Sequence, residues 1–234
     1  MLFGKITTKI YNMRANNAFR TGNIPETLSW LDKSYKTGRA DPKVVTTYGY
    51  MLLKYGHLNE AEKILKEQLA APNLPNNAYY DAKSNYALVL WKQGQLDKAI
   101  AMFEDILPNF KNTNVYGSLG YLYILQGDLE KALKFNLEAY EYNRTGGVIL
   151  DNLGQTYYLA GDNENAEKTF KALMDLNPKF PEAYYDYALV CEKAGNMEKC
   201  KEMLKNALKY DTNYLSVITT EDIENKLKEL DNIE

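Results

Sequence analysis

Six glycines recur along this chain at a nearly constant spacing, at Gly22, Gly56, Gly94, Gly127, Gly161 and Gly195. The intervals between them are 34, 38, 33, 34 and 34 residues. A period of this length is typical of stacked supersecondary units, each too small to bury its own apolar face. The chain therefore has to build its core between neighbouring repeats as well as within them.

Each repeat contains two apolar runs at helical spacing, separated at the glycine. This pattern predicts a pair of antiparallel helices whose turn holds the glycine in a left-handed conformation. With the glycine at position 15 of a 34-residue unit, four residues (76–79) are inserted after the second repeat, and the third is one residue short. The sequence thus predicts an all-α chain, a single solenoid over 1–234, with repeats at 8–41, 42–75, 80–112, 113–146, 147–180 and 181–214.

Small residues recur at two positions of the repeat. Position eight lies in the first helix and position 20 in the second, so each pair of small residues allows the two helices to approach closely. A bulky side chain at either position would overpack the joint, at about 1–3 kcal/mol. The small residues are Ala15, Gly49, Ala87, Gly120, Gly154 and Ala188 at position eight, and Ala61, Ala99, Ala132, Ala166 and Cys200 at position 20.

The order of characteristic positions (aromatic, Leu, Gly, Tyr, Gly, Ala, Phe, Ala, Pro) resembles the tetratricopeptide repeat family over about 8–214. The resemblance implies a right-handed superhelical solenoid of stacked antiparallel helix pairs, with about six repeats. The fourth to sixth repeats match best, although Asn136 stands where an aromatic is usual and Gly146-Gly147 suggests a hinge or a changed stacking angle. The closing proline survives only as Pro178. The first repeat departs from the pattern at Arg14, Thr27 and Ser34.

Both ends of the chain carry further helical patterns. The segment 219–222 has the residue types of a helix start, and Ile223, Leu227 and Leu230 follow at helical spacing. These residues predict a C-terminal capping helix at 220–231. At the other end, Leu2, Phe3, Ile6, Ile10 and Met13 predict an amphipathic helix that packs on the first repeat; a membrane-surface role is the alternative.

Composition excludes several function classes. The net charge is −3, and no dense basic stripe suggests nucleic-acid binding. No apolar run approaches the ~20 residues of a membrane helix, and no signal peptide is expected, so we expect a cytoplasmic protein. The abundance of Lys, Asn and Tyr suggests an AT-rich bacterial coding sequence.

Motifs typical of catalytic, cofactor-binding or metal-binding sites are also missing from the sequence. There is no glycine-rich phosphate loop and no metal-ligand spacing, and the only histidine, His57, falls in a predicted surface turn. Cys191 and Cys200 fall at interior positions and are expected to be buried free thiols. We therefore expect no enzyme, no cofactor and no metal.

In the tetratricopeptide family, the first helices line a concave groove, and this implies candidate binding residues here. We expect apolar and aromatic side chains along the groove and cations near its N-terminal end. An exposed stripe of this kind is typical of an interaction site. The implied contacts are Tyr50, Leu53, Leu88, Trp91, Tyr121, Ile124, Tyr158 and Tyr185, with Arg20, Lys43 and Lys54 as the cations.

The resulting hypothesis is a non-catalytic protein–protein interaction scaffold. It would bind an extended or helical peptide with apolar anchors, whose acidic end would lie by the three cations. The structural alternative is that neighbouring first helices bury the same side chains against each other. Functional alternatives are a peptide-sensing regulatory module and a self-assembling structural or adaptor protein, such as a homodimer. Self-assembly is suggested by residues 1–117, with 15 basic against 10 acidic residues, and 118–234, with 13 against 21.

One binding mode of the family is not expected. Its carboxylate clamp needs Lys and Asn at positions five and nine of one repeat, Asn at position six of the next, and Lys and Arg at positions two and six of the third. Here Asn12 and Asn16 are followed by Thr47, Asp81 and Asn85, and no run of three repeats supplies the cations.

Overall fold

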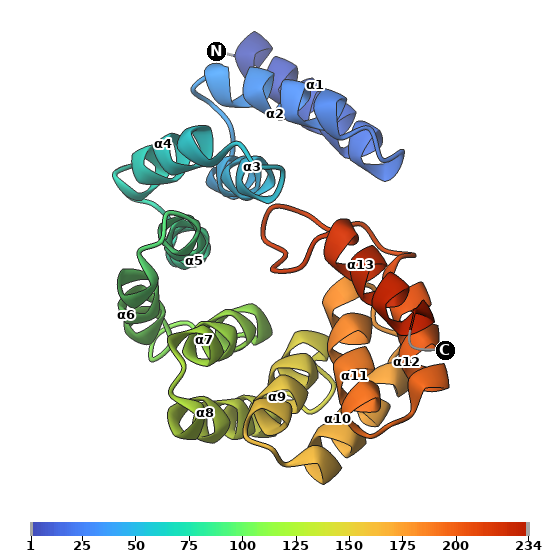
Figure 1. Ribbon diagram of the computed structural model, residues 1–234. Coiled ribbons are helices and arrows are strands. Elements are labelled where there is room, and N and C mark those ends of the chain that lie inside the picture. The colour runs from blue at the N-terminus through green and yellow to red at the C-terminus, as the bar shows by residue number, and fades with distance from the viewer. Residues whose placement is uncertain (1, 233–234) are drawn as a thin grey trace. The chain divides into compact units, whose positions relative to one another are not determined.

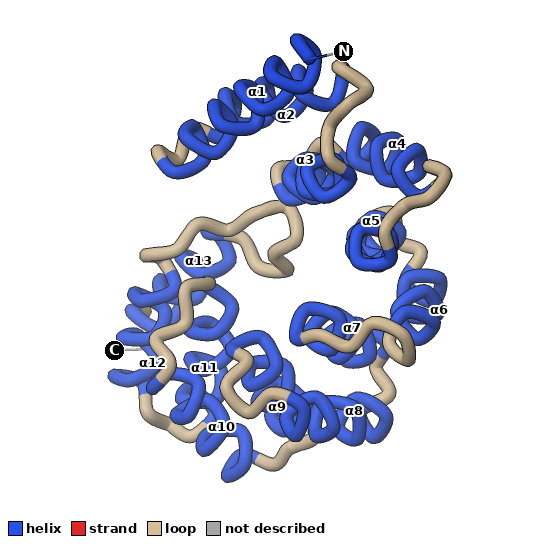
Figure 2. Tube along the Cα trace, turned by 180° about the vertical axis from the view of Figure 1, so that it is seen from behind, coloured by secondary structure: helices blue, strands red, loops and turns tan. Residues whose placement is uncertain are grey.

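The computed structural model describes residues 2–232, with side chains from residue 6 onward, and contains 13 α-helices in that range (Figures 1 and 2). No strand occurs among the described residues, so the predicted all-α repeat fold is confirmed. The chain divides into two compact units, Met1–Ile106 and Leu107–Glu234. A single continuous solenoid over 1–234 stays a prediction, and each unit is described by itself below.

The N-terminal unit consists of three antiparallel helix pairs (Figure 1). Helices α3 and α4 both pack against α5, so the second pair stacks on the third. The pairs are α1 (Leu2–Arg20) with α2 (Ile24–Lys36), α3 (Pro42–Lys54) with α4 (Leu58–Leu69), and α5 (Asn76–Lys92) with α6 (Leu96–Ile106).

The C-terminal unit contains three more pairs and a last helix, α13 (Thr220–Asp231), that packs on α12. The first helices of the three pairs, α7, α9 and α11, pack against one another in succession. A loop of irregular structure joins α12 to α13 (Figure 2). The pairs are α7 (Thr113–Gln126) with α8 (Leu129–Tyr142), α9 (Gly147–Leu159) with α10 (Asn163–Asp175), and α11 (Pro181–Lys193) with α12 (Met197–Ala207).

The recurring glycines end the first helix of each pair as predicted. All six have positive φ, between 73° and 85°, where a side chain with a Cβ would be strained. After five of the six glycines, the N–H of the following residue donates to the carbonyl five residues earlier, as from His57 to Leu52, which satisfies the end of the helix; at the sixth, Gly127 itself donates to the Ile124 carbonyl. The side chains that then cap the second helices are Asn23, Asp128, Asp162 and Asn196.

The small residues hold each pair of helices in close contact. A Cβ added to Gly154 would lie 2.7 Å from the ring of Phe170, and one added to Gly49 would lie 2.7 Å from Leu65. On the second helices, the small side chains have no exposed surface, as Ala166 shows. The predicted close approach is therefore present in both units.

Two details of the N-terminal unit differ from the prediction. The amphipathic start and the first helix of the first repeat form one continuous helix, α1. Its apolar residues Ile6, Ile10 and Met13 are 40–57% exposed, whereas Ala15 and Ala18 are buried. The predicted packing of this segment on the first repeat is present, since Thr8 and Asn12 form hydrogen bonds with Thr37 and Ser34 at the end of α2, but the apolar side chains of Ile6, Ile10 and Met13 stay exposed. The side chains of Leu2 and Phe3 lie outside the described residues. The inserted residues 76–79 form an extra first turn of α5.

The predicted capping helix is confirmed at its predicted bounds. A capping box formed by Thr219 and Asp222 starts α13. Ile223 and Leu230 are buried in the apolar cluster that includes α11 and α12. The helix thus closes the core of the C-terminal unit.

Asn136 stands where the repeat usually has an aromatic residue, and its side chain takes part in a buried hydrogen-bond network. Its Nδ2 lies 3.0 Å from Oγ1 of Thr156, which donates to the Asn152 carbonyl, and Asn152 donates to the carbonyl of Gly117 at 2.7 Å. The network links α8 and α9 to α7. The sequence suggested a hinge or a changed stacking angle at Gly146-Gly147. Gly146 is the buried N-cap residue of α9 and lies inside the C-terminal unit, whereas the boundary between the two compact units lies at 106/107.

Substituting Gly154→Ala tests the close helix contact. We expect a loss of about 1–3 kcal/mol in the free energy of unfolding, because the new methyl group overlaps the Phe170 ring. Gly147→Ala on the same helix is the matched control, since its Cβ would lie 3.5 Å from Phe180, an ordinary contact. That control should be neutral or stabilising by up to about 1 kcal/mol. Urea unfolding followed by circular dichroism measures both; equal effects would contradict the packing argument.

Candidate functional site

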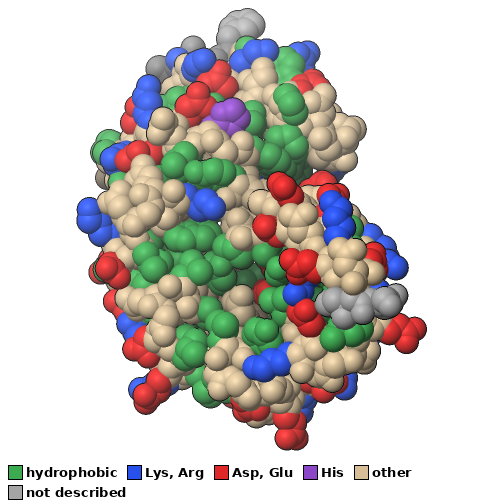
Figure 3. Space-filling model, in the orientation of Figure 1, with side chains coloured by type: hydrophobic (Ala, Val, Ile, Leu, Met, Phe, Trp, Pro, Cys, Tyr) green, Lys and Arg blue, Asp and Glu red, His purple; other side chains and the backbone are tan. Residues whose placement is uncertain are grey.

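The predicted groove residues of the N-terminal unit lie at different depths. Tyr50, Leu88 and Trp91 are partly buried on α3 and α5, and burial raises the pKa of Tyr50. The Lys92 ammonium lies 4.8 Å from the centre of the Trp91 ring. Leu53 has no exposed surface, so its assignment as a ligand contact is corrected: it belongs to the core. Figure 3 shows hydrophobic side chains gathered where α5 is seen end-on.

The three predicted cations do not form one cluster through any described contact. Arg20 is the last residue of α1 and is exposed, and Lys43 is exposed in the first turn of α3. Lys54 is partly buried at the end of α3. The charge of Lys43 lowers the pKa of Asp81 on α5, although burial raises it by more. Lys43 thus acts electrostatically on an acidic side chain of the neighbouring helix pair.

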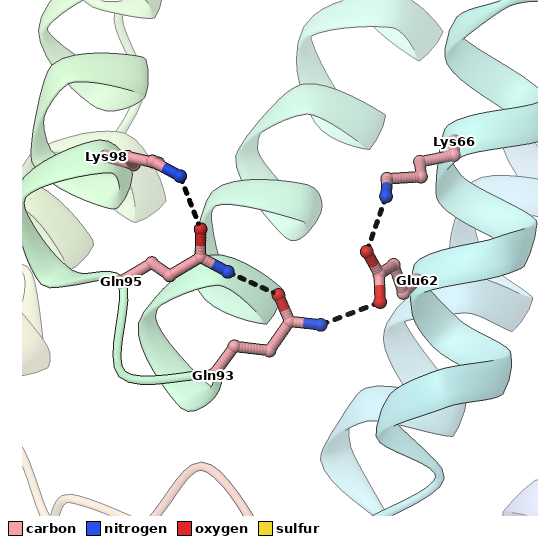
Figure 4. Close-up of polar contacts among 5 residues, drawn as sticks. All are labelled: Glu62, Lys66, Gln93, Gln95 and Lys98. Atoms are coloured by element: carbon pink, nitrogen blue, oxygen red, sulfur yellow. Dashed lines mark hydrogen bonds and ion pairs between the residues drawn. The ribbon is translucent and has the colours of Figure 1, made fainter.

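Sequence reasoning missed a cavity of about 700 Å³, largely open to solvent, which is lined by residues of α4, α5 and α6 and of the turn between α5 and α6. A chain of polar contacts crosses its wall (Figure 4): Lys98 donates to Gln95, Gln95 to Gln93, and Gln93 to Glu62, which also pairs with Lys66 at 2.6 Å. No predicted groove residue lines this cavity. The network joins α4 to α6 through the turn between α5 and α6, a kind of contact that repeat spacing does not indicate.

In the C-terminal unit, three tyrosines lie on three successive first helices. Tyr121 on α7, Tyr158 on α9 and Tyr185 on α11 are all partly exposed. The Lys193 ammonium lies 5.0 Å from the centre of the Tyr158 ring. Ile124 is only 7% exposed and packs in the core, so it too is corrected from a groove contact to a core residue.

Three acidic side chains accompany these tyrosines. Asp151 lies on α9, and Glu182 and Asp186 lie one turn apart on α11. The pKa of Tyr121 on α7 is raised by burial and then by the charges of Asp186, Glu182 and Asp151. The charges of the three acids therefore act on Tyr121 across three helices that pack in succession.

The environment raises the pKa of two of these carboxyl groups. Burial raises the pKa of Asp151 well above its ordinary value, and the charges of Asp186 and Glu182 raise it further. Burial and the Glu182 charge raise the pKa of Asp186 to about 7. Asp151 is 8% exposed, and its Oδ1 has no hydrogen-bond partner. An ionised carboxylate in this position is costly unless a cation is nearby.

Part of this cluster had a signal in the sequence. Asp151 interrupts the apolar start of α9, and Glu182 and Asp186 share one face of α11. Their convergence with Tyr121 was not evident, because it depends on how three helices stack. Within residues 2–232, no group of three His, Cys, Asp or Glu residues is arranged to hold a metal ion, and no helix has the length and apolar character needed to cross a membrane.

Comparison with known proteins identifies the repeat. A family model described as Tetratricopeptide repeat matches residues 52–119 and 157–218, and a second model of the same description matches 113–145. Together they cover more than half of the chain. Repeat proteins of this kind generally serve as scaffolds for protein–protein contacts.

Individual relatives are distant. Tetratricopeptide repeat protein 6 of Homo sapiens is 25% identical over 164 residues, which are 70% of this chain and 31% of that protein. A TPR repeat-containing protein of Methanocaldococcus jannaschii is 24% identical over 236 residues, covering 97% of this chain and 39% of that protein. This chain thus spans less than two fifths of either relative.

Solved structures share the fold. A thermophilic TPR protein of Thermus thermophilus has a TM-score of 0.64 at 18% identity, with 81% of this chain and 96% of that chain covered. The pilF protein of Pseudomonas aeruginosa has a TM-score of 0.64 at 10% identity, with 96% and 99% covered. At these identities, the likeness concerns the fold alone.

The acidic cluster predicts a pH dependence of stability. Since the pKa of Asp186 is raised to about 7 from an ordinary value near 4, the folded chain holds a proton that the unfolded chain has lost in that interval. The resulting stabilisation is complete below about pH 4 and is lost as the pH rises through about 7. We expect Asp186→Asn to flatten the fall in the urea midpoint between pH 5 and 8. Asp211→Asn, at an exposed loop position, should leave it unchanged; parallel curves for all three proteins would contradict the assignment.

Proposed function

The chain belongs to the tetratricopeptide repeat family, and on that premise we propose that it is a non-catalytic scaffold whose first-helix faces bind a segment of another protein. The observation that carries the proposal is the series Tyr121, Tyr158 and Tyr185. These rings lie partly exposed on helices that pack in succession. Tyrosines offer large contact area at a low cost in conformational entropy, so a row of them suits peptide binding.

The N-terminal unit supports the same proposal with different residues. Tyr50, Leu88 and Trp91 provide partly exposed apolar surface, and Lys43 provides a cation beside it. Arg20 and Lys54 lie at the ends of α1 and α3. We propose that apolar anchors of the bound segment contact the aromatic side chains, and that an acidic group of the same segment lies nearest Lys43. A cytoplasmic setting remains a prediction.

Self-association is a second candidate because of one specific observation. On α1, the apolar side chains of Ile6, Ile10, Met13 and Phe19 are 40–57% exposed. An exposed apolar face of this kind favours contact with another chain. Light scattering of the wild type against an Ile10→Ser variant distinguishes this candidate, since a loss of mass with the variant supports it and a monomeric wild type excludes it.

The tyrosine series gives a direct test of peptide binding. A displayed library of random twelve-residue peptides is selected on the wild-type protein, and the enriched peptides are measured by fluorescence anisotropy. We expect Tyr121→Ala and Tyr158→Ala each to weaken binding about tenfold or more, as loss of an interface hot spot does. Leu137→Ala is the control, because this side chain is 40% exposed on α8, a second helix.

Thermal unfolding of the same variants separates binding from packing. The proposal requires weaker binding at an unchanged unfolding midpoint. A large fall in the midpoint with Tyr121→Ala or Tyr158→Ala would instead show that these rings serve the core. Enrichment of no peptide, or equal effects of the three variants on affinity, would also count against the proposal.

A further inference from the structure

Helix α1 has an apolar stripe on the side that faces away from the rest of its repeat. It carries four exposed large apolar side chains, whereas no other helix of the described chain carries more than two. Three of them, Ile6, Ile10 and Met13, follow at intervals of four and three residues, so they lie on one face of the helix. The next position of the same face is Asn17, which is also exposed.

The opposite face of α1 is fixed on α2, which lies beside it (Figure 1). Ala15 and Ala18 are buried in this contact, and the Ser34 hydroxyl donates to Oδ1 of Asn12 at 2.6 Å. Helix α1 is therefore held in place by α2 while its apolar stripe stays open. A partner that binds the stripe would not have to fold α1 first, which lowers the entropic cost of binding.

The stripe has only basic residues along its two borders. Helical spacing places Lys9 and Arg20 on one side and Arg14 on the other, and all three are exposed. On the Arg14 side, the Trp30 ring of α2 has two cations over it, with the Arg14 guanidinium at 4.6 Å and the Lys33 ammonium at 4.0 Å from its centre. The sequence of α1 contains no acidic residue. The stripe therefore complements an apolar surface that is bordered by acids.

We propose that the apolar stripe of α1 binds an acidic amphipathic helix of a partner protein. Apolar side chains of that helix pack between Ile6, Ile10 and Met13, and its acidic residues lie beside Lys9 and Arg14. The inference goes beyond the proposed function, because this surface lies outside the tyrosine series. It also assigns a heterologous partner to the face on which self-association was considered.

The shape and charge of the stripe favour this partner over two others. A narrow stripe at intervals of four and three residues is typical of a contact between two helices, whereas a helix that lies in a membrane surface has a wider apolar face. A polar residue such as Asn17 is tolerated within a helix–helix seam, where it fixes the register. A second copy of α1 would bring Lys9 and Arg14 against further cations, which repel them.

The test uses three fluorescein-labelled synthetic helices of about three heptads each. The first has isoleucine and leucine at positions a and d and glutamate at e and g. The second has lysine at e and g, and the third keeps the glutamates but has serine at a and d. In fluorescence anisotropy with the full chain, we expect the first peptide to bind at least tenfold more tightly than either of the others.

A pair of double variants tests whether the stripe is the binding surface. Ile6→Ser/Ile10→Ser should weaken binding of the first peptide at least tenfold. Because both side chains are 40–48% exposed, the unfolding midpoint measured by circular dichroism should stay unchanged. The matched control is Leu137→Ser/Leu176→Ser, which removes two apolar side chains that are 40–43% exposed in the C-terminal unit. Equal weakening by both double variants would overturn the proposal.

A charge reversal tests the basic border. Lys9→Glu should weaken binding of the first peptide about threefold or more and strengthen binding of the second, since a charge at the rim of an interface selects its partner. Lys63→Glu is the control, because Lys63 is exposed on α4 of the same unit. It should change either affinity less than twofold. The same response to both reversals would show that only net charge matters and would count against the stripe.

The remaining outcomes also decide the question. Equal binding of the three peptides, or binding of none, overturns the proposal. Sedimentation of the protein with vesicles of phosphatidylserine and phosphatidylcholine, lost in Ile6→Ser/Ile10→Ser, would replace the partner helix by a membrane surface if no peptide binds. A dimer in light scattering that the same variant dissociates would replace it by a second copy. The library selection and the tyrosine variants decide the proposed function independently of these results.

Discussion

The close approach of two helices at a pair of small residues is the contact on which the rest of the structure depends. Where Gly154 meets Phe170, no room exists even for one additional methyl group. This contact fixes the distance between the helices of a pair, and the left-handed glycine after the first helix fixes their direction. The orientation of each first helix then determines which of its side chains face the next repeat and which remain exposed.

This dependence explains why much of the fold follows from the sequence. Steric constraints at the turn glycines and small positions are local, so their spacing predicts the helix pairs, and the capping box at Thr219 predicts the start of α13. The start of the chain was harder, because an apolar face alone does not indicate what covers it. In α1, Ala15 and Ala18 allow α2 to approach, and the larger Ile10 and Met13 are left exposed. Small size, and not apolar character, decides the contact there.

The candidate site is less predictable for the same physical reason. A repeat position gives the direction of a side chain but not its depth, so Leu53 and Ile124 fall in the core while Tyr50 and Tyr121 remain partly exposed. Electrostatic effects depend further on which helices converge. The charge of Asp186 on α11 reaches Tyr121 on α7, 65 residues away in the chain, because α9 lies between and packs against both.

The acidic residues of the sixth repeat also explain in physical terms why this chain lacks the carboxylate clamp associated with its family. The clamp uses Lys and Arg at positions two and six of its third repeat, and the same positions of the sixth repeat here hold Glu182 and Asp186. The preceding repeat does keep Asn at position six, but Asn152 is buried and donates to the Gly117 carbonyl, so it supports the helices and offers nothing to a ligand. Two acids at these positions repel a peptide carboxylate where the clamp would attract one.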